Sequence, residues 1–244
     1  AGSLTVLVET IAGILSLFLI PFFEIKFPSD IRIYLLFFLA TIFYTIQDRL
    51  ATISRSGLEA STYGILKQLS NVFMLVMGFI SFKEKLTIEK VLGAILLIGS
   101  NIFIFYRKDS WKNKKYIIIG VVANITMGIA LFLDVSTSTN FNLAIYISLT
   151  LLIPALINSL VEKIKFTDLR YEYKINKSRL ILLTGILWSV MMFSKLLSYR
   201  FGEVTKIAPL CSLSVMLNVI VEYVFFKDRD NLLRKIIASV FIII

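Results

Sequence analysis

Nine runs of apolar residues follow one another along the chain, and short polar segments separate them. The runs cover residues 4–23, 31–46, 60–82, 88–106, 116–133, 143–160, 180–199, 207–226 and 232–244. Most of them approach the roughly 20 residues that a helix needs to cross the hydrocarbon core of a bilayer. Because lipid offers no hydrogen-bond partner to a peptide group, such runs predict helices. We therefore expect an all-α membrane protein, a polytopic helical bundle with about nine spans present.

The composition is typical of a chain that exposes much of its surface to lipid. Hydrophobic residues make up 57% of the chain and charged residues 17%, and the mean hydropathy is +0.84. An ordinary soluble domain cannot bury so large an apolar fraction in one core. We expect a multi-pass integral protein of the cell membrane whose partners are the lipid bilayer and a small-molecule solute. Whether two copies form a homodimer stays open.

Charge and residue usage exclude several classes of function. The net charge of +10 does not indicate nucleic-acid binding, because the basic residues fall mainly between the apolar runs, where they meet lipid headgroups. The chain has one cysteine, Cys211, and no histidine, so it lacks the commonest metal ligand and the commonest base at neutral pH. No Gly-rich phosphate loop is present. We expect no metal site, no cofactor and no enzymatic activity.

Internal repetition is the most informative feature of the sequence. A shift of 144 in residue number places the third run over the eighth. The charged turn after each run then coincides, with Lys83 and Glu84 over Lys227 and Asp228. The other matched pairs are Phe82/Phe226, Lys85/Arg229, Glu59/Glu203, Leu66/Leu210, Leu69/Leu213, Ser70/Ser214 and Ala94/Ala238. Membrane composition explains matched leucines, but it does not readily explain a matched charged turn.

The repeat divides the chain into two copies. The first copy, residues 1–106, holds four apolar runs, a basic linker covers residues 107–115, and the second copy, residues 116–244, holds five runs. This difference predicts that the first span of a ten-span fold is missing and that the last helix is truncated. Because five is odd, the two copies enter the membrane from opposite sides, as in transporters with inverted repeats. The expected fold is therefore a bundle of inverted five-helix repeats.

Lysine and arginine are unevenly divided between the two sets of alternate loops. One set carries 17 of them, including those in the linker 107–115 and in the loop 163–179, and the other set carries seven. The positive-inside rule places the set with 17 in the cytoplasm.

The charged turn and the small residues after it form a recognisable pattern. It comprises residues 78–84, Leu86, Thr87, Gly93, Ala94 and Gly99 in the first copy, and Ala208, Pro209, Leu210, residues 226–228 and Ala238 in the second. This pattern resembles the EamA-like branch of the drug/metabolite transporter superfamily, over essentially the whole chain. The second copy departs from the family at Asp228, where Glu is usual, and at Ile237, where glycine is usual.

The resemblance implies ten helices in two five-helix repeats. It also implies transport of an amino acid, a related metabolite or a xenobiotic, often outward. In that family the turn at residues 83–90 is cytoplasmic, which is opposite to the orientation that the charge count favours. The orientation in the membrane therefore stays open.

Two repeat-related runs present polar residues at three- and four-residue steps. The first face holds Tyr63, Lys67, Ser70, Met74 and Gly78, with Asn71 beside it. Its equivalents in the second copy are Ile207, Cys211, Ser214, Asn218 and Glu222. Two symmetry-related polar faces could line a solute cavity. The alternative is that these small polar residues only form hydrogen bonds between packed helices.

Two lysines lie inside predicted spans. Lys67 stands well inside its run, where an ammonium on an isolated helix costs on the order of 3 kcal/mol. It either receives an anionic substrate or carboxylate, or it snorkels to the rim or pairs with Glu9 or Glu222. Lys195 lies nearer the end of its run, so snorkelling is favoured over solute binding.

Acidic and aromatic residues supply the remaining candidates. The candidates for binding a coupling ion are Glu222, Glu9 and Asp134, of which the last two lie near run ends and are expected at the rim. Trp188 and Tyr44 lie deeper and could stack on a planar solute. A separate stripe at four-residue steps, typical of close helix packing, consists of Gly120, Asn124 and Gly128.

The leading hypothesis for function is a secondary active transporter that moves a small metabolite or drug-like solute by alternating access. The alternatives are a membrane-embedded enzyme acting on a lipid-linked substrate, or a passive channel. Such an enzyme would need paired acids, or a nucleophile with its base, near one membrane face. The sequence shows no such cluster.

Overall fold

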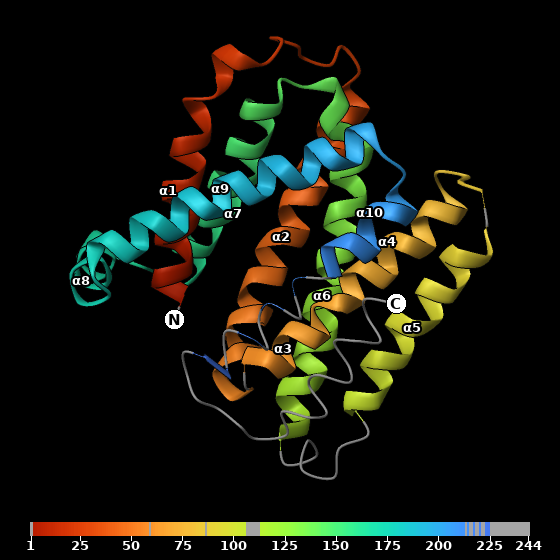
Figure 1. The fold of residues 1–244 in the computed structure, drawn as a ribbon. Coiled ribbons are helices and arrows are strands. Elements are labelled where there is room, and N and C mark those ends of the chain that lie inside the picture. Colours follow the sequence, from red (N-terminus) through yellow and green to blue (C-terminus); the bar gives the residue numbers. More distant parts are fainter. Residues whose placement is uncertain are drawn as a thin grey trace. The chain divides into compact units, whose positions relative to one another are not determined.

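The computed structural model describes residues 2–58, 60–85, 87–105, 113–212, 214, 217, 220, 223 and 224. Every regular element in this part of the chain is helical (Figure 1). The helices are α1 (Gly2–Leu17), η1 (Ile20–Phe22), α2 (Ile31–Gly57), α3 (Ala60–Leu66), α4 (Gln68–Ile80), α5 (Ile88–Phe105), α6 (Lys114–Thr137), η3 (Ser138–Asn140), α7 (Leu143–Val161), α8 (Phe166–Ile175), α9 (Ser178–Phe201) and α10 (Val204–Ser212). The all-α prediction is confirmed for the described residues.

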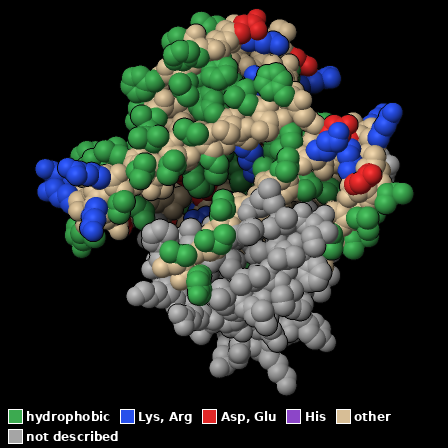
Figure 2. Space-filling model, in the orientation of Figure 1, with side chains coloured by type: hydrophobic (Ala, Val, Ile, Leu, Met, Phe, Trp, Pro, Cys, Tyr) green, Lys and Arg blue, Asp and Glu red, His purple; other side chains and the backbone are tan. Residues whose placement is uncertain are grey.

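Several of these helices are suited to a lipid environment. Five segments are long and apolar enough to cross a membrane, namely Ile31–Gly57, Thr62–Ile80, Lys114–Asn140, Leu143–Val161 and Ser178–Phe201, and α1 is a shorter apolar helix. Figure 2 shows hydrophobic side chains over α9 and lysine and arginine side chains gathered at α8. The described structure is therefore compatible with an integral membrane protein.

Two elements differ from the sequence prediction, and a third has internal detail. Within the run 60–82, Thr62–Ile80 is one candidate span, in which a turn at Lys67 with helical backbone angles separates α3 from α4. The run 31–46 continues as α2 to Gly57, because its polar extension buries Gln47 and Ser54 on one side. The basic loop 163–179 contains α8, whose start is capped where Asp168 Oδ2 accepts the Lys165 backbone N–H at 2.9 Å. The last apolar run, 232–244, lies outside the described residues.

The chain forms two compact units, and each unit contains parts of both sequence copies. Unit 1 comprises Ala1–Thr52 and Ala130–Phe201, and unit 2 comprises Ile53–Ile129 and Gly202–Ile244. Helices α2 and α6 contribute residues to both units.

In unit 1, α1 packs along α7 and α9 (Figure 1). Small residues allow this close approach, and hydroxyl groups bridge it. The Ser148 hydroxyl donates to the Gly13 carbonyl at 2.8 Å, and the hydroxyls of Ser16 and Ser189 lie 3.0 Å apart. The apolar core around these contacts includes Ala12, Phe37, Phe141, Leu143, Ala144, Tyr146, Ile147, Leu151, Met192, Phe193 and Leu196.

In unit 2, α4 packs against α10 and α5. The stripe of small residues on α6 also makes close contacts in this unit. A Cβ on Gly120 would lie 2.6 Å from Ser54 Oγ, and one on Gly128 would lie 2.8 Å from the Phe73 side chain. The prediction that this stripe packs closely against other helices is confirmed.

We predict that Gly13→Val lowers the thermal stability of the purified full-length protein in detergent. A Cβ at Gly13 would lie 2.7 Å from Leu152 Cγ, so α1 and α7 must separate. Overpacking of this kind typically costs about 1–3 kcal/mol. The control is Thr184→Val, because Thr184 is exposed and its hydroxyl bonds only to the Leu180 carbonyl of its own helix. Equal melting temperatures for the two variants would contradict the proposed contact.

Candidate functional site

A carboxyl group is fully buried among the helices of unit 1. Asp134, one turn before the end of α6, has 0% of its surface exposed. With Asp134 as a carboxylate, the Tyr44 hydroxyl from α2 donates to Oδ2 at 2.6 Å, and the Tyr146 hydroxyl from α7 donates to Oδ1 at 2.7 Å. The Tyr146 oxygen also lies 2.8 Å from the Thr137 hydroxyl. We call Asp134, Tyr44, Tyr146 and Thr137 the Asp134 cluster.

Aromatic rings separate the Asp134 cluster from the adjacent end of unit 1. The ring centroid of Phe37 lies 5.2 Å from that of Tyr146 and 5.6 Å from that of Phe141, and the rings of Phe141 and Tyr146 are 5.3 Å apart. Tyr34 adds an edge-on contact with Phe141 at 5.5 Å. The carboxyl group therefore lies in apolar surroundings, where an unpaired charge is costly.

Two basic side chains of α9 act on the Asp134 cluster. Lys195 interacts electrostatically with Asp134, and Arg200 interacts with Tyr146. Arg200 Nη2 also donates to the Ser138 carbonyl just after α6. The sequence indicated that Lys195 snorkels, but the structure gives it an acidic neighbour.

The structure corrects the expected position of two acidic residues. Glu9 and Asp134 were expected at the rim because they stand near the ends of apolar runs, but they are 5% and 0% exposed. Distance along a helix does not determine burial when neighbouring helices extend past that point. For Asp134, α7 and the tyrosine on α2 cover the end of α6.

The predicted aromatic candidates have structural partners. Tyr44 is 6% exposed and its hydroxyl is engaged by Asp134, so it does not present a free face to a planar solute. Trp188 packs against the apolar core of unit 1.

Sequence reasoning did not single out Tyr146. Its position four residues into an apolar run was the available signal.

The polar face predicted on the third run is largely buried in unit 2. Tyr63, Ser70 and Asn71 are between 2% and 7% exposed, whereas Lys67 is half-buried at the turn between α3 and α4. The Asn71 amide donates to Gln68 Oε1 at 2.7 Å and to the Ser212 hydroxyl at 3.0 Å. The bond to Ser212 links α4 to α10, whereas the bond to Gln68 lies within α4.

The repeat-related face on α10 is only partly as expected. Ile207 is buried, Cys211 is half-buried and Ser214 is exposed, with its hydroxyl bonded to the Cys211 carbonyl. Ser212 is the residue on α10 that contacts Asn71, and the spacing argument did not include it. Asn218 and Glu222 lie outside the described residues. The interhelical hydrogen bond therefore comes from Ser212, beside the predicted face.

The charged turn that defined the repeat caps a helix in unit 2. Glu84 accepts the backbone N–H groups of Val204 at 2.7 Å and Thr205 at 2.9 Å, and it also accepts the Thr205 hydroxyl. A carboxylate at this position complements the positive end of α10 and satisfies its free N–H groups. Beside it, the Lys90 ammonium lies 3.0 Å from Glu203 Oε2. A matched charged turn thus joins the starts of α5 and α10.

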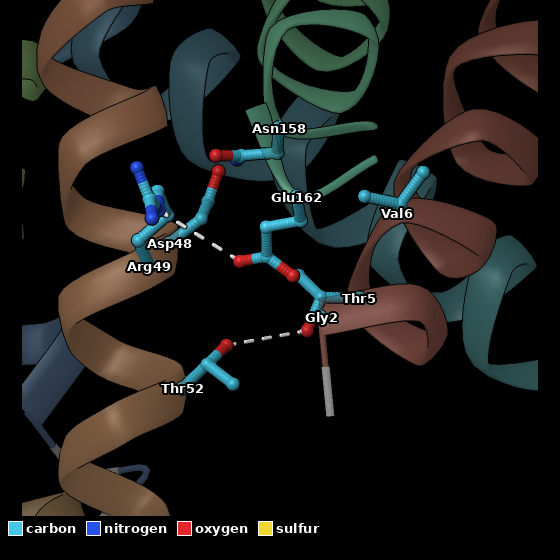
Figure 3. Close-up of a pocket in the computed structure, with 8 residues that line it drawn as sticks. All are labelled: Gly2, Thr5, Val6, Asp48, Arg49, Thr52, Asn158 and Glu162. Atoms are coloured by element: carbon cyan, nitrogen blue, oxygen red, sulfur yellow. Dashed lines mark hydrogen bonds and ion pairs between the residues drawn. The ribbon is translucent and has the colours of Figure 1, made fainter. Parts of the chain in front are cut away.

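Unit 1 contains a small polar cavity of about 10 Å³, the size of one water molecule. Its lining residues are Gly2, Thr5, Val6, Asp48, Arg49, Thr52, Asn158 and Glu162 (Figure 3). Arg49 Nε lies 3.7 Å from Glu162 Oε1, and the hydroxyls of Thr5 and Thr52 lie 3.5 Å apart. Figure 3 shows the side chains of Asp48 and Asn158 pointing toward each other. The cavity is too small for a metabolite.

The described residues contain no group of side chains that could bind a metal ion. Among them, no group of three or more Asp, Glu, Cys or His side chains converges as a metal site would require. The Asp134 cluster holds a single carboxyl group with hydroxyl neighbours, which is suited to binding a proton.

No protein-family model matches this chain, and no curated protein matches it.

We predict a pH-dependent contribution of Glu203 to stability. Hydrogen bonds from Lys206 and Lys90 hold the pKa of the Glu203 carboxyl below its usual range. A carboxyl with a lowered folded pKa stabilises the fold at pH values above its unfolded pKa, about 4.3. This stabilisation is lost as the pH falls through the folded pKa.

Glu203→Gln should therefore unfold at a lower temperature than the wild type at neutral pH, and the difference should disappear in acid. Thermal unfolding of the full-length protein over a pH series measures this difference. Glu24→Gln, at an exposed position in unit 1, is the control. A difference that persists or grows in acid would refute the assigned pairing.

Proposed function

We propose that this protein is a secondary active transporter that moves a small metabolite across the membrane by alternating access. In this proposal the chain has two inverted repeats like those of EamA-like transporters. Its substrate is an amino acid, a related metabolite or a drug-like solute.

The observation that carries the proposal is that helix boundaries recur at the sequence shift of 144. Helix α1 ends at Leu17 and α7 at Val161, and α2 ends at Gly57 and α9 at Phe201. Helix α3 begins at Ala60 and α10 at Val204. Three coincident boundaries support a repeat of whole helices, beyond the matched residues of one turn.

Repeat-related helices also pack on each other. Helix α1 packs on its equivalent α7 in unit 1. Contact between equivalent helices is what a two-fold relation between the copies produces near its axis.

The contacts within unit 1 support alternate crossing of the membrane. At one end, Asn142 binds the carbonyls of Phe23 and Glu24, which joins the segment after α1 to the start of α7. At the other end, Arg49 contacts Glu162, which joins α2 to the end of α7. In the proposal, loops related by the repeat lie on opposite sides of the membrane, as an inverted repeat requires.

The substrate class is proposed from the polar residues near α4 and α10. Lys67 lies at a break between two helices, where its carbonyl accepts the Ser70 hydroxyl at 2.7 Å. Broken helices bring ends and side chains toward a substrate in many transporters. We propose that the Lys67 ammonium receives the carboxylate of an anionic or zwitterionic solute.

The inverted repeat predicts opposite labelling of two equivalent positions. In a Cys211→Ser background, Lys26→Cys and Arg170→Cys stand 144 residues apart, and both native side chains are exposed. A membrane-impermeant maleimide should label them from opposite sides of oriented vesicles. Thr139→Cys is the control, because Lys26 Nζ bonds to the Thr139 carbonyl at 3.3 Å and the two should label from the same side. Labelling of Lys26→Cys and Arg170→Cys from one side would refute the inverted repeat.

Transport itself is predicted to show counterflow. Proteoliposomes containing the full-length protein and preloaded with an unlabelled amino acid or organic acid should take up the labelled solute faster than empty ones. Lys67→Ala should lose this uptake for anionic and zwitterionic solutes, whereas Lys67→Arg, which keeps the charge, should retain part of it. A channel would take up labelled solute at the same rate with and without preloading, and an enzyme would take up none. Each of these two outcomes would refute the carrier.

A further inference from the structure

The Asp134 cluster contains one more oxygen–oxygen contact than its hydroxyl groups can supply with protons. Four contacts occur in series. Tyr44 to Asp134 Oδ2 measures 2.6 Å and Tyr146 to Asp134 Oδ1 measures 2.7 Å. Tyr146 to Thr137 measures 2.8 Å, and Thr137 to the Leu133 carbonyl measures 2.8 Å. Each of these short contacts needs one proton between its two oxygens.

Three hydroxyl groups carry only three protons. If Asp134 is ionised, Tyr44 and Tyr146 donate to its two oxygens, and the Thr137 hydroxyl has one proton for two acceptors, Tyr146 and the Leu133 carbonyl. That proton is then shared in a three-centre arrangement, and both contacts are weaker than full hydrogen bonds. If Asp134 carries a proton on Oδ1, it donates to Tyr146, Tyr146 donates to Thr137, and Thr137 donates to Leu133. All four contacts are then satisfied.

From this proton count we propose that Asp134 is a proton-binding site, occupied in the conformation seen here, and that it carries the proton that drives transport. This inference rests on the proposed function and adds the coupling ion to it. The neutral form also suits a side chain that is 0% exposed, because burial disfavours an unpaired charge.

The charged neighbours define what happens when the proton leaves. Lys195 faces Asp134 from α9, Arg200 faces Tyr146 from the same helix, and Asp48 faces Tyr44 from α2. Release breaks the Asp134 O–H bond and transfers the proton to water, which leaves a carboxylate. Tyr44 and Tyr146 then both donate to that carboxylate, and the Lys195 ammonium balances its charge. Thr137 and Tyr146 lose one hydrogen bond in this step, so release favours a different packing of α6 and α7.

The first test is infrared spectroscopy of the full-length protein in lipid at neutral pH, because it needs no substrate. A protonated carboxyl shows a carbonyl band that is distinct from carboxylate bands and shifts in D₂O. We expect this band in the wild type, its loss in Asp134→Asn, and a shift in Tyr146→Phe, which removes one partner of the carboxyl. Asp30→Asn, at an exposed position, is the control and should leave the band unchanged. Absence of the band from the wild type would overturn the proposal.

The second test measures proton movement across the same proteoliposomes with a pH-sensitive dye trapped inside. Addition of a transported solute should acidify or alkalinise the interior in the wild type. Asp134→Asn should abolish this proton movement, whereas Asp30→Asn, at an exposed position, should keep it. Solute-driven proton movement in Asp134→Asn would overturn the proton role and leave the carrier intact. Absence of counterflow in every variant would instead refute the carrier, and with it the coupling, while the infrared band still decides whether Asp134 binds a proton.

Discussion

Polar groups inside apolar helices must find partners within the protein, and this requirement organises each unit of the structure. Water is excluded from such helices, so an unbonded carboxyl, amide or hydroxyl costs several kcal/mol by order of magnitude. In unit 1 the Asp134 carboxyl is engaged by tyrosines from two other helices. In unit 2 the Asn71 amide finds Gln68 and Ser212. The positions of a few polar side chains therefore determine which helices pair and in what register.

Small residues permit the close approach that these bonds need. Ser148 reaches the Gly13 carbonyl because neither residue holds the two backbones apart. The same principle applies on α6, where Gly120 and Gly128 admit side chains from neighbouring elements of unit 2. In lipid there is little hydrophobic force between helices, so van der Waals contact and hydrogen bonds carry most of the association. Gly13 on α1 and Ser148 on α7 thus together allow close packing and form a hydrogen bond between the two helices.

The charged turn and the buried acid represent two uses of a carboxyl group. Glu84 stays near the helix ends, where it satisfies backbone N–H groups and helps to order the start of α10. Asp134 lies behind aromatic rings, where hydroxyl groups surround it and a lysine acts on it from α9. In the first environment the carboxylate serves as a helix cap. In the second, the hydrogen-bond count depends on one proton, and a group of that kind can couple protonation to helix packing.

The sequence by itself determined the helical class and most helix positions of the described residues. Apolar length and the absence of backbone partners in lipid are local properties, so runs such as 143–160 predicted α7 almost to the residue. The matched turn at Glu84 was visible in the sequence, but its role as a cap on α10 depends on a residue 120 positions away in number. The tertiary structure alone decided that Asp134 and Glu9 are buried, that Ser212 rather than Ser214 contacts Asn71, and that Lys67 stands at a helix break. Burial and pairing depend on which other helices cover a residue, and no pattern along one helix contains that information.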